Sequence, residues 1–350
     1  MEEQPRTRRP SSVQDIARAA GVSVGTVSNV LNNPHLVAAG TRARVEAALR
    51  STGFVRNAAA RQLKGLPSAI VGCLVLDLSN LFFAEIARGI EDRLEEEGCI
   101  VNLCSSDLKR EREEQYLRVL QEVRVRGVIL GTLDPAGSGL RDLVARDIPV
   151  VLLDAPRSGL PVCAVTVDNL AGGRAVAEHL LAQGHRRIAL LDGGILVPSV
   201  SDRITGARQA VLARGLDPDQ VFRKVSLGPP AHAGTPGPAI DAALAHPDPC
   251  TAFLCYNDMA ALSIMLGLRE RGLAVPGDVS VAGYDDLRFT SMVTPALTTV
   301  RQPTYEFGRA AADLLFAEGE PDHEHREVLF TPELVVREST APPGGGRRSR

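Results

Sequence analysis

The chain has 350 residues, which is too long for one ordinary domain and suits two or three. Hydrophobic residues make up 44% of it and charged residues 23%, as is typical of a soluble globular protein. The net charge of −3 is unevenly distributed along the chain. Residues 1–66 carry 10 Lys and Arg against 4 Asp and Glu, and the rest of the chain carries 29 Lys and Arg against 38 Asp and Glu. A basic head on an acidic body indicates that the head alone meets a polyanion, although a solvated basic terminus would have the same charge.

No apolar run approaches the 18 residues of a membrane span, and the N-terminus lacks the apolar core of a signal peptide. We therefore expect a cytoplasmic protein with no membrane partner. The six cysteines form no C-x-x-C pair, and several stand in apolar runs, as Cys73 does, which is typical of buried, reduced thiols. Because no histidine lies near them in the sequence at ligand spacing, we predict no metal, and no motif indicates a cofactor.

The first predicted element is a helix over 13–20. Its apolar residues recur on one face, and Ser12 with Asp15 three positions later is a near capping box. Gly21 is predicted to end this helix in a left-handed conformation, and Ser23 to cap the next helix.

Helices over 24–32 and 41–52 follow, the latter beginning at a Thr41 cap. Two short helices joined by a Gly-containing turn form a helix-turn-helix unit, whose second helix enters the major groove of DNA, although a three-helix bundle without a DNA role fits the same spacing. The outward face of helix 24–32 is small and polar, so Asn29 can bond an adenine edge and Val24 can meet a thymine methyl. Phosphate contacts are expected from Arg42, Arg44, Arg56, Ser23 and Thr41.

The stretch Val13–Asn32 and the segments 41–45 and 57–63 resemble the lactose-repressor family of bacterial transcription regulators, and the likeness continues to about Arg337. In that family a hinge follows the third helix, orders as a helix on operator DNA and wedges a Leu into the minor groove. The resemblance implies this role for Leu63, since an apolar wedge unstacks a base step and kinks the duplex.

Spacing and resemblance together imply a set of DNA-binding residues: Ser23, Val24, Gly25, Thr26, Ser28, Asn29, Asn32, Arg42, Asn57, Ala60, Leu63 and Lys64. One of them departs from the family, because many members carry Arg where this chain has Asn29. Asn cannot make the bidentate contact that Arg makes with guanine, so the resemblance does not imply which base is read there.

From residue 69 to residue 284, apolar strands alternate with amphipathic helices, the pattern of parallel sheets covered on both faces. We expect an all-α helix-turn-helix head with a hinge helix, and an α/β core of two doubly wound parallel-sheet lobes, which the resemblance identifies as periplasmic-binding-protein-like. The expected organisation is a disordered 1–11, a head over 12–56, a hinge and linker over 57–67, a core over 68–338 (lobe 1 about 68–166 and 302–322, lobe 2 about 167–299 and 328–338) and a disordered tail over 339–350.

Polar residues follow several predicted strands, and ligands of open α/β sheets sit beyond such strand ends, so the cleft between the lobes is the expected ligand site. For any single Asp at a strand end, helix capping is an equally good interpretation. The family's effector contacts map onto Phe82, Phe83, Asp154, Ser199, Arg203, Asn257 and Asp285. Carboxylates, an amide and an Arg suit the hydroxyls of a sugar or sugar derivative; a nucleobase or nucleoside corepressor is the alternative.

Catalysis is not expected, because the body has no Gly-rich phosphate loop and no nucleophile elbow. His323 and His325 fall in a predicted loop, and Asp258 and Asp286 are expected to cap helices. The missing signal peptide and the basic head argue against a plain solute-binding protein, and the site chemistry argues against a sugar-metabolising enzyme. The prediction is a ligand-responsive repressor that binds near-palindromic double-stranded operator DNA as a homodimer, since no apolar heptad run after Arg337 indicates a coiled-coil tetramer.

Overall fold

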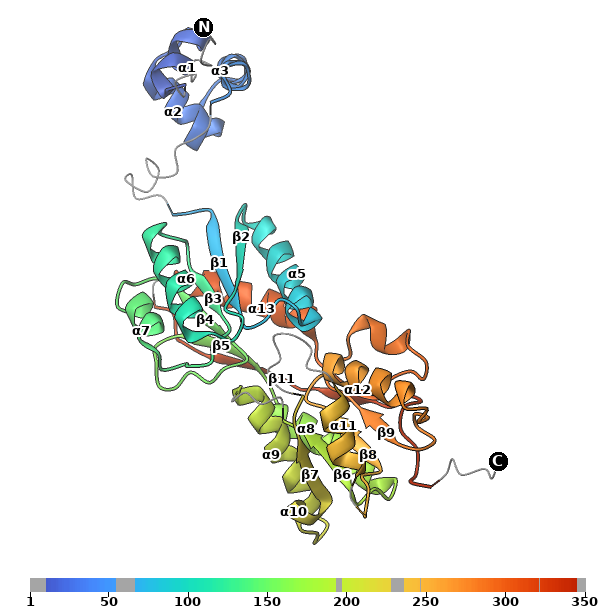
Figure 1. Ribbon diagram of the computed structural model, residues 1–350. Coiled ribbons are helices and arrows are strands. Elements are labelled where there is room, and N and C mark those ends of the chain that lie inside the picture. The colour runs from blue at the N-terminus through green and yellow to red at the C-terminus, as the bar shows by residue number, and fades with distance from the viewer. Residues whose placement is uncertain are drawn as a thin grey trace, which may run out of the picture. The chain divides into compact units, whose positions relative to one another are not determined.

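The computed structural model describes residues 11–54, 67–192, 197–227, 236–245, 247–320 and 322–344 (Figure 1). The chain divides into two compact units, a head up to Ser68 and a body from Ala69 onward, and each is described by itself. Residues 57–66 of the expected hinge and linker lie outside the described residues.

The head consists of the helices α1 (Val13–Ala20), α2 (Val24–Asn32) and α3 (Ala39–Thr52) and a 3-10 turn, η1 (Pro34–Leu36). Helices α1 and α2 begin and end at the predicted residues. Their inward faces and that of α3 form one small core: Ile16, Ala17, Ala20, Val27, Val30, Val45 and Ala48.

Capping explains why α1 begins and ends where it does. Ser12 Oγ accepts a hydrogen bond from the Asp15 amide at 3.3 Å, and Asp15 Oδ2 accepts one from the Ser12 amide at 2.9 Å, so the capping box is confirmed. Gly21 ends the helix at a φ of 64°, in the left-handed region that glycine adopts without strain.

Two expectations for the head are wrong. Helix α3 begins at Ala39, and Thr41 lies in its first turn, where its amide donates to the Ala38 carbonyl at 3.0 Å; the extended Ala38 takes the cap position with no side-chain cap bond among the described residues. Ser11, expected to be disordered, donates from its hydroxyl to the Thr52 carbonyl at 3.0 Å, because the end of α3 lies beside the start of α1.

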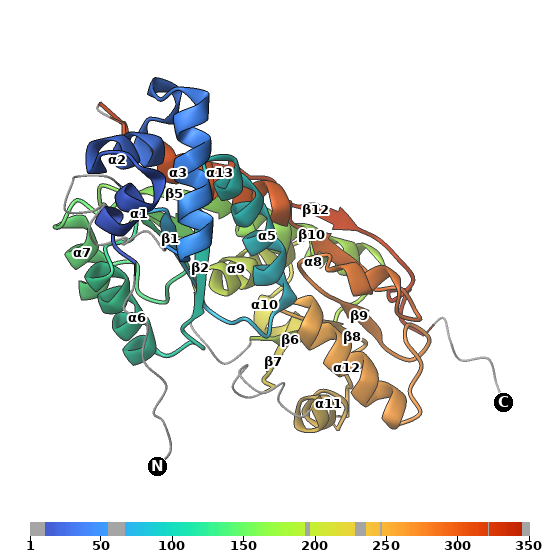
Figure 2. The ribbon, with the colours of Figure 1, turned by 90° about the horizontal axis from the view of Figure 1, so that it is seen from above.

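Lobe 1 of the body is built on a six-stranded sheet. Its strands are β1 (Ile70–Val75), β2 (Ile100–Ser105), β3 (Val128–Leu130), β4 (Val150–Leu153), β5 (Cys163–Val167) and β11 (Glu327–Phe330). All pairs are parallel, in the order β11-β5-β4-β3-β1-β2. Helices α5 (Leu81–Glu96) and α13 (Thr304–Ala317) lie side by side on one face (Figures 1 and 2), and α6 (Arg110–Glu122) and α7 (Ser138–Val144) cover the other.

Lobe 2 is a four-stranded parallel sheet in the order β7-β6-β8-β9. Its strands are β6 (Ile188–Leu191), β7 (Phe222–Val225), β8 (Ala252–Leu254) and β9 (Ser280–Ala282). Helices α8 (Asn169–Ala182) and α9 (Pro198–Leu212) pack on one face, and α11 (Pro236–Leu244) and α12 (Asp258–Glu270) pack on the other. The lobe also holds the short α10 (Pro218–Val221), the 3-10 turn η3 (Arg288–Ser291), and an antiparallel pair, β10 (Thr299–Arg301) and β12 (Glu333–Val335).

The C-terminal part of the body differs from the expectation in two places. Residues 328–330 were assigned to lobe 2, but β11 pairs with β5 in the sheet of lobe 1, because the chain re-enters that sheet after α13. The expected disordered tail starts too early: Ser339 is buried and exchanges hydrogen bonds with Val281 of β9, and the Ala341 amide donates to Ser280 Oγ at 3.0 Å. Residues 345–350 lie outside the described residues.

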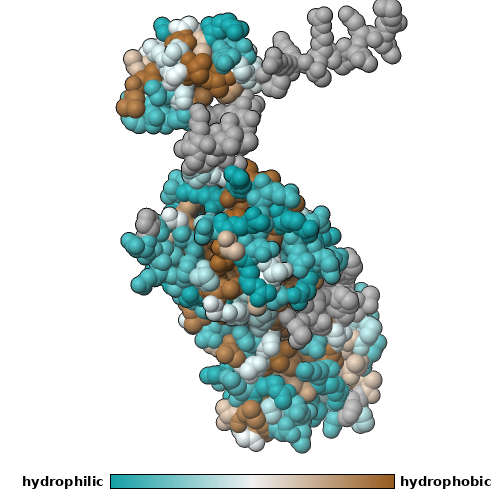
Figure 3. All heavy atoms as spheres, turned by 90° about the vertical axis from the view of Figure 1, so that its left-hand side faces the viewer, coloured by the Kyte–Doolittle hydropathy of each residue, from teal (hydrophilic) through white to brown (hydrophobic). Residues whose placement is uncertain are grey.

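The surface of the body is mainly hydrophilic in the view of Figure 3, with hydrophobic residues in smaller patches between polar ones. All six cysteines are unpaired, and five of them are buried. In the described part of the chain, no helix is both long enough and apolar enough to cross a membrane.

Candidate DNA-binding face and effector site

The outward face of α2 is small, polar and open to solvent. Val27 and Val30 are buried in the head core, which turns Val24, Gly25 and Asn29 outward, and all three are exposed. Asn32 is exposed as well, and its Nδ2 donates to Ser28 Oγ at 3.3 Å, which brings two of the predicted base-contacting residues together. The fold therefore leaves the expected base-reading face accessible to a groove.

The start of α2 is held by Ser23, whose Oγ accepts from the Thr26 amide at 3.0 Å and lies 2.9 Å from Thr26 Oγ1. The unpaired amide groups at such a helix start favour a phosphate. Arg42 and Arg44 on α3 are exposed, and Arg42 Nε lies 3.8 Å from Glu46 Oε1 in an exposed ion pair. The predicted DNA contacts at Arg56, Asn57, Ala60, Leu63 and Lys64 lie outside the described residues.

The seven residues expected to bind an effector line one cavity of about 100 Å³ between the lobes. Phe82, Phe83 and Asp154 come from lobe 1, and Ser199, Arg203, Asn257 and Asp285 come from lobe 2. The structure thus brings them together from elements that are far apart in the sequence; contact with an effector stays a prediction.

Arg203 is the centre of this cavity's polar contacts. Its Nε donates to Asn169 Oδ1 and its Nη1 to the Tyr256 carbonyl, both at 2.8 Å. Its guanidinium carbon lies 3.7 Å from the centre of the Tyr284 ring, a cation–π contact. These contacts fix the plane of the guanidinium, so it can present a directed pair of donors to a ligand.

The position of Arg203 depends on close packing between α8 and α9. A Cβ atom added at Gly173 of α8 would lie 2.0 Å from the Arg203 carbonyl oxygen, so only glycine allows this approach. The approach brings Asn169, at the start of α8, within reach of the guanidinium.

Asp285 is fully buried beside Arg203, with Asp285 Oδ1 3.7 Å from Arg203 Nη1. The same oxygen accepts from Gln302 Nε2 at 2.7 Å, whereas Oδ2 is buried and has no hydrogen-bond partner among the described residues. Burial raises the pKa of this carboxyl well above its usual value, although the Arg203 charge acts in the opposite direction. A buried oxygen of this kind is a ready acceptor for a ligand hydroxyl.

The other predicted contacts are partly engaged by the protein itself. Asp154 Oδ1 accepts from Asn169 Nδ2 at 2.9 Å, which links the two lobes. Asn257 Oδ1 accepts from the Ala260 amide at 2.8 Å and so caps α12, which leaves its Nδ2 to meet a ligand. Phe82 and Phe83 pack edge to face, with ring centres 5.2 Å apart.

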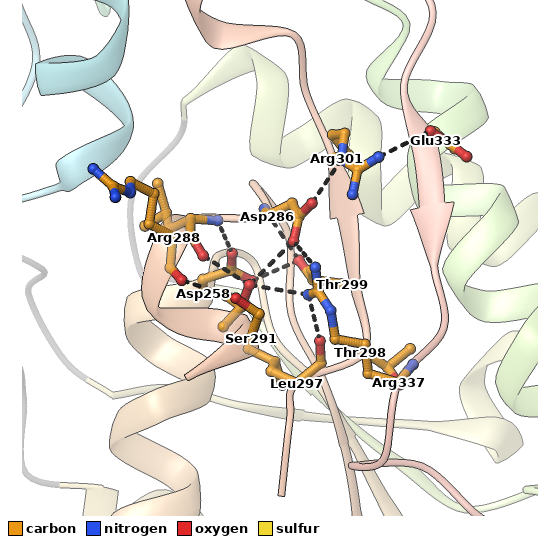
Figure 4. A network of polar contacts seen from close by, with 12 residues as sticks. Asp258, Asp286, Arg288, Ser291, Leu297, Thr298, Thr299, Arg301, Glu333 and Arg337 are labelled. Carbon is orange, nitrogen blue, oxygen red and sulfur yellow. Dashed lines mark hydrogen bonds and ion pairs between the residues drawn. The ribbon is translucent and has the colours of Figure 1, made fainter. Parts of the chain in front are cut away.

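Asp258 and Asp286 do not cap helices as expected; they join separate segments of lobe 2 through a network of polar contacts (Figure 4). The buried Asp258 accepts from Thr299 Oγ1 at 2.6 Å and from the Leu287 amide at 2.9 Å. Asp286 accepts from Arg301 Nε at 2.7 Å and from Arg337 Nη2 at 2.6 Å. Both carboxylates follow strand ends, but three of their donors, Thr299 and Arg301 on β10 and Arg337 after β12, lie far along the chain, which sequence spacing does not show.

The environments of Asp258 and Asp286 shift their pKa values in opposite directions. Burial raises the pKa of Asp258 to about 7, despite its hydrogen bonds with Thr299 and Leu287. Burial also opposes ionisation of Asp286, but hydrogen bonds from Arg337 and Arg301 outweigh it and lower its pKa. The network holds the segment that carries the neighbouring Asp285.

The sequence reasoning missed four residues that contact Arg203 or Asp285, of which Tyr256 also lines the cavity: Asn169, Tyr256, Tyr284 and Gln302. Asn169 follows β5, so the rule that polar residues after strands line the cleft would have found it. Gln302 follows β10, a strand of three residues that has no clear periodicity, so no comparable signal was available.

Two family descriptions match the chain. Residues 12–57 match the bacterial regulatory proteins of the lacI family, and residues 177–340 match a periplasmic binding protein-like domain. The first match covers the helices of the head, and the second covers lobe 2 from within α8 onward, together with α13 and β11 of lobe 1.

Similar proteins match over nearly the full length. The HTH-type transcriptional regulator DegA of Bacillus subtilis (strain 168) is 32% identical over 340 residues, which are 95% of this chain and 98% of that protein. A solved complex of the transcriptional regulator CelR with cellobiose is 30% identical, with a TM-score of 0.67 over 95% of this chain and 100% of the other. The lac repressor dimer bound to operator and the anti-inducer ONPF is 28% identical, with a TM-score of 0.77 and the same coverage.

Proposed function

Because the chain belongs to the lacI family of bacterial regulatory proteins and is a transcriptional regulator, not an enzyme, we propose that it is a homodimeric repressor with a sugar-like effector. In this proposal the head binds a near-palindromic operator, and the effector in the interlobe cavity sets the affinity for that operator. The observation that carries the effector part is Asp285 Oδ2, a buried acceptor without a partner among the described residues, beside Arg203 in the cavity.

The chemistry of the cavity favours a polyhydroxylated ligand. A sugar hydroxyl both donates and accepts, so it can donate to Asp285 while a neighbouring oxygen accepts from Arg203 or from Asn257 Nδ2. Phe82 and Phe83 supply an apolar wall for the C–H face of a sugar ring. The similar CelR was solved with cellobiose, which agrees with this class of ligand.

The size of the cavity favours coupling between the ligand and the lobes. Its volume of about 100 Å³ is below the roughly 300 Å³ of a usual ligand site. A neighbouring hollow of about 700 Å³ shares Asp154 and Ser199 with it. A sugar that occupies both spaces would have to move lobe 1 against lobe 2, and in this proposal that movement reaches the hinge over 57–64.

The DNA part of the proposal rests on the open face of α2. Val24, Gly25 and Asn29 are exposed and small enough to approach base edges. A homodimer presents two such faces, which is why the operator is expected to be close to palindromic. Leu63, by resemblance, would enter the minor groove between the two half-sites.

The effector part is tested by a thermal-shift screen of the full-length protein with sugars, sugar phosphates and nucleobases, since a ligand of the native state raises its melting temperature. The ligand found is then added to operator complexes of the wild type, Arg203→Ala and Asp285→Asn. Arg208→Ala is the matched control, because Arg208 lies on the same helix but pairs on the surface with Asp219. We expect the first two variants to bind operator and ignore the ligand. A normal response from both would exclude this cavity, and a nucleobase as the only ligand would replace the sugar.

The hinge part is tested with Leu63→Ala. Loss of the wedge should weaken operator binding about tenfold or more and leave random-sequence DNA and the effector bound as before, since the kink costs a few kcal/mol that the wider contact with bent operator offsets. Equal losses for operator and random DNA would contradict the wedge.

A further inference from the structure

A cluster of four metal-ligating side chains lies in lobe 1, outside the cavity and the head. Cys163 is the first residue of β5, Glu318 follows the last turn of α13, and His323 and His325 lie in the connection from α13 to β11. One donor atom from each lies within 4.8 Å of the donor atoms of the other three. Cys163 and His323 are 160 residues apart in the sequence, so local spacing could not indicate the cluster.

The distances inside the cluster suit one small cation. Cys163 Sγ lies 3.1 Å from His323 Nε2, and His325 Nδ1 lies 3.1 Å from Glu318 Oε1. His323 Nε2 lies 4.0 Å from the same Glu318 oxygen. A tetrahedral zinc site with bonds of about 2.0–2.3 Å separates its donor atoms by roughly 3.3–3.8 Å. Shifts of less than 1 Å would therefore centre the four donors on an ion.

The donor set and its surroundings favour a transition metal over a hard cation. A thiolate and two imidazoles are soft or borderline ligands that suit zinc, whereas calcium and magnesium prefer oxygen alone. Cys163 is fully buried, and the side chains of Glu318 and His323 are 6% and 11% exposed, so three of the four donors are shielded from water. His325 is half-buried, which leaves a path for an ion from solvent.

Backbone contacts already orient two of the ligands. The Arg326 amide donates to Cys163 Sγ at 3.3 Å, and the Cys163 amide donates to Glu318 Oε1 at 2.7 Å. Such contacts hold ligands in place and stabilise a thiolate. From these observations we propose that Cys163, Glu318, His323 and His325 form a binding site for a divalent transition metal ion of the zinc class.

The ion would join three elements: β5 and β11, at the edge of the sheet where both strands begin, and the end of helix α13. Cys163 stands at the start of β5, and β11 begins two residues after His325. In this parallel sheet β1 starts at the same edge, at Ile70, and the cavity residue Asp154 follows the opposite, carboxyl end of β4. The ion would therefore stiffen the edge of lobe 1 where the chain enters from the head, away from the effector.

When the ion binds, the Cys163 thiol must release its proton. The metal–sulfur bond forms as the S–H bond of Cys163 breaks, and the proton passes to solvent. The bound ion's two positive charges are then matched by the thiolate and the Glu318 carboxylate.

The experiment uses the full-length protein, stripped with a chelator and dialysed, with Zn²⁺ and Co²⁺ as probes. We expect one Zn²⁺ per chain, a rise in melting temperature, and a thiolate-to-cobalt charge-transfer band with Co²⁺. Cys163→Ser and His325→Ala should each bind Zn²⁺ at least tenfold more weakly and lose the rise in melting temperature. His325 is half-buried, so the second variant tests the site even if Cys163→Ser does not fold.

The matched control is Cys104→Ser, which removes a half-buried thiol of β2, in the same lobe and outside the cluster. It should bind Zn²⁺ as the wild type does. Absence of the charge-transfer band in the wild type would overturn the proposal, as would equal Zn²⁺ affinity in the wild type and His325→Ala. A band that also disappears in Cys104→Ser would place the metal elsewhere.

Discussion

The exposed face of α2, predicted to read DNA, comes from one short stretch of chain and projects outward, whereas the predicted effector cavity is assembled from several distant segments and faces inward. Val24, Gly25 and Asn29 are exposed and largely independent of one another. Arg203 and Asp285 are buried and joined to each other and to Asn169, Tyr256 and Gln302. We therefore expect substitutions on α2 to act separately, and substitutions in the cavity to act through their neighbours.

The largest effect is expected from Arg203→Ala. It should lower the free energy of unfolding by about 3–5 kcal/mol, because it leaves Asp285 buried without its charged partner and two carbonyl acceptors without a donor. Urea unfolding of the wild type, Arg203→Ala, Asp285→Asn and the double variant measures this. The double variant should be more stable than the sum of the two single losses predicts. If the losses of unfolding free energy in the two single variants simply add in the double variant, Arg203 and Asp285 stabilise the fold independently of each other.

The next largest effect is expected in the pH dependence of the unfolding free energy, through Asp258. Its folded-state pKa of about 7 lies above the roughly 4 of an unfolded carboxyl, so the folded protein keeps a proton that the unfolded chain releases. Its contribution to stability is therefore full below pH 4 and is lost as the pH rises through 7. Relative to Asp258→Asn, the wild type should lose about 1.4 kcal/mol of unfolding free energy per pH unit in that window.

Asp286→Asn is the matched control for this measurement. The pKa of Asp286 is lowered, so its contribution is present above the unfolded pKa and is lost as the pH falls through the folded one, below pH 4. A constant difference between the wild type and Asp258→Asn from pH 4 to pH 7 would show that burial does not raise this pKa.

A smaller effect is expected from Asn29→Ala in the head. It should cost about 1–3 kcal/mol of operator affinity, since one bidentate contact with a base is worth that much, and leave random-sequence binding unchanged. Electrophoretic or fluorescence titration with operator and with variants at the contacted base pair tests this. If Asn29→Ala binds every sequence with wild-type affinity, α2 does not read a base through this residue.

The smallest effect is expected from Arg42→Ala, whose side chain is exposed and weakly paired with Glu46. Loss of one phosphate contact should weaken binding to all sequences alike and reduce the salt slope by about 1. The Asn29→Ala and Arg42→Ala losses should add in the double variant. Marked non-additivity would show that these two head residues act through one another, as the cavity residues are expected to do.

The accuracy of the sequence predictions follows the range of the interactions. Helices α1 and α2 and the capping box were predicted to the residue, because they depend on contacts three or four residues apart. Thr41 was placed wrongly because Ser/Thr preference at a cap is weak beside the packing that positions α3. In the body, the strand–helix alternation identified two lobes, but the lobe that β11 joins depends on pairing with β5, 163 residues earlier in the chain.

The seven predicted effector contacts line one cavity, because strand ends and the family resemblance point to the same positions; their contact with an effector stays a prediction. The roles of Asp258 and Asp286 were predicted wrongly, because their hydrogen-bond partners on β10 and at Arg337 lie far along the chain. No metal was predicted, because no histidine lies near a cysteine at ligand spacing in the sequence. Such spacing says nothing about residues that folding brings together, as it does Cys163, Glu318, His323 and His325.

By itself, the sequence determined the helical head, the open outward face of α2, the alternation of strands and helices in the body, and the family. Those features depend on local periodicity and on motifs of adjacent residues, which the chain carries whatever it packs against. Only the tertiary structure decided which polar groups of the body meet: the Arg203–Asp285 pair, the Asp286 network and the cysteine–histidine cluster. The physical reason is that parallel sheets join strands through long crossovers, so residues far apart along the chain become neighbours at the strand ends.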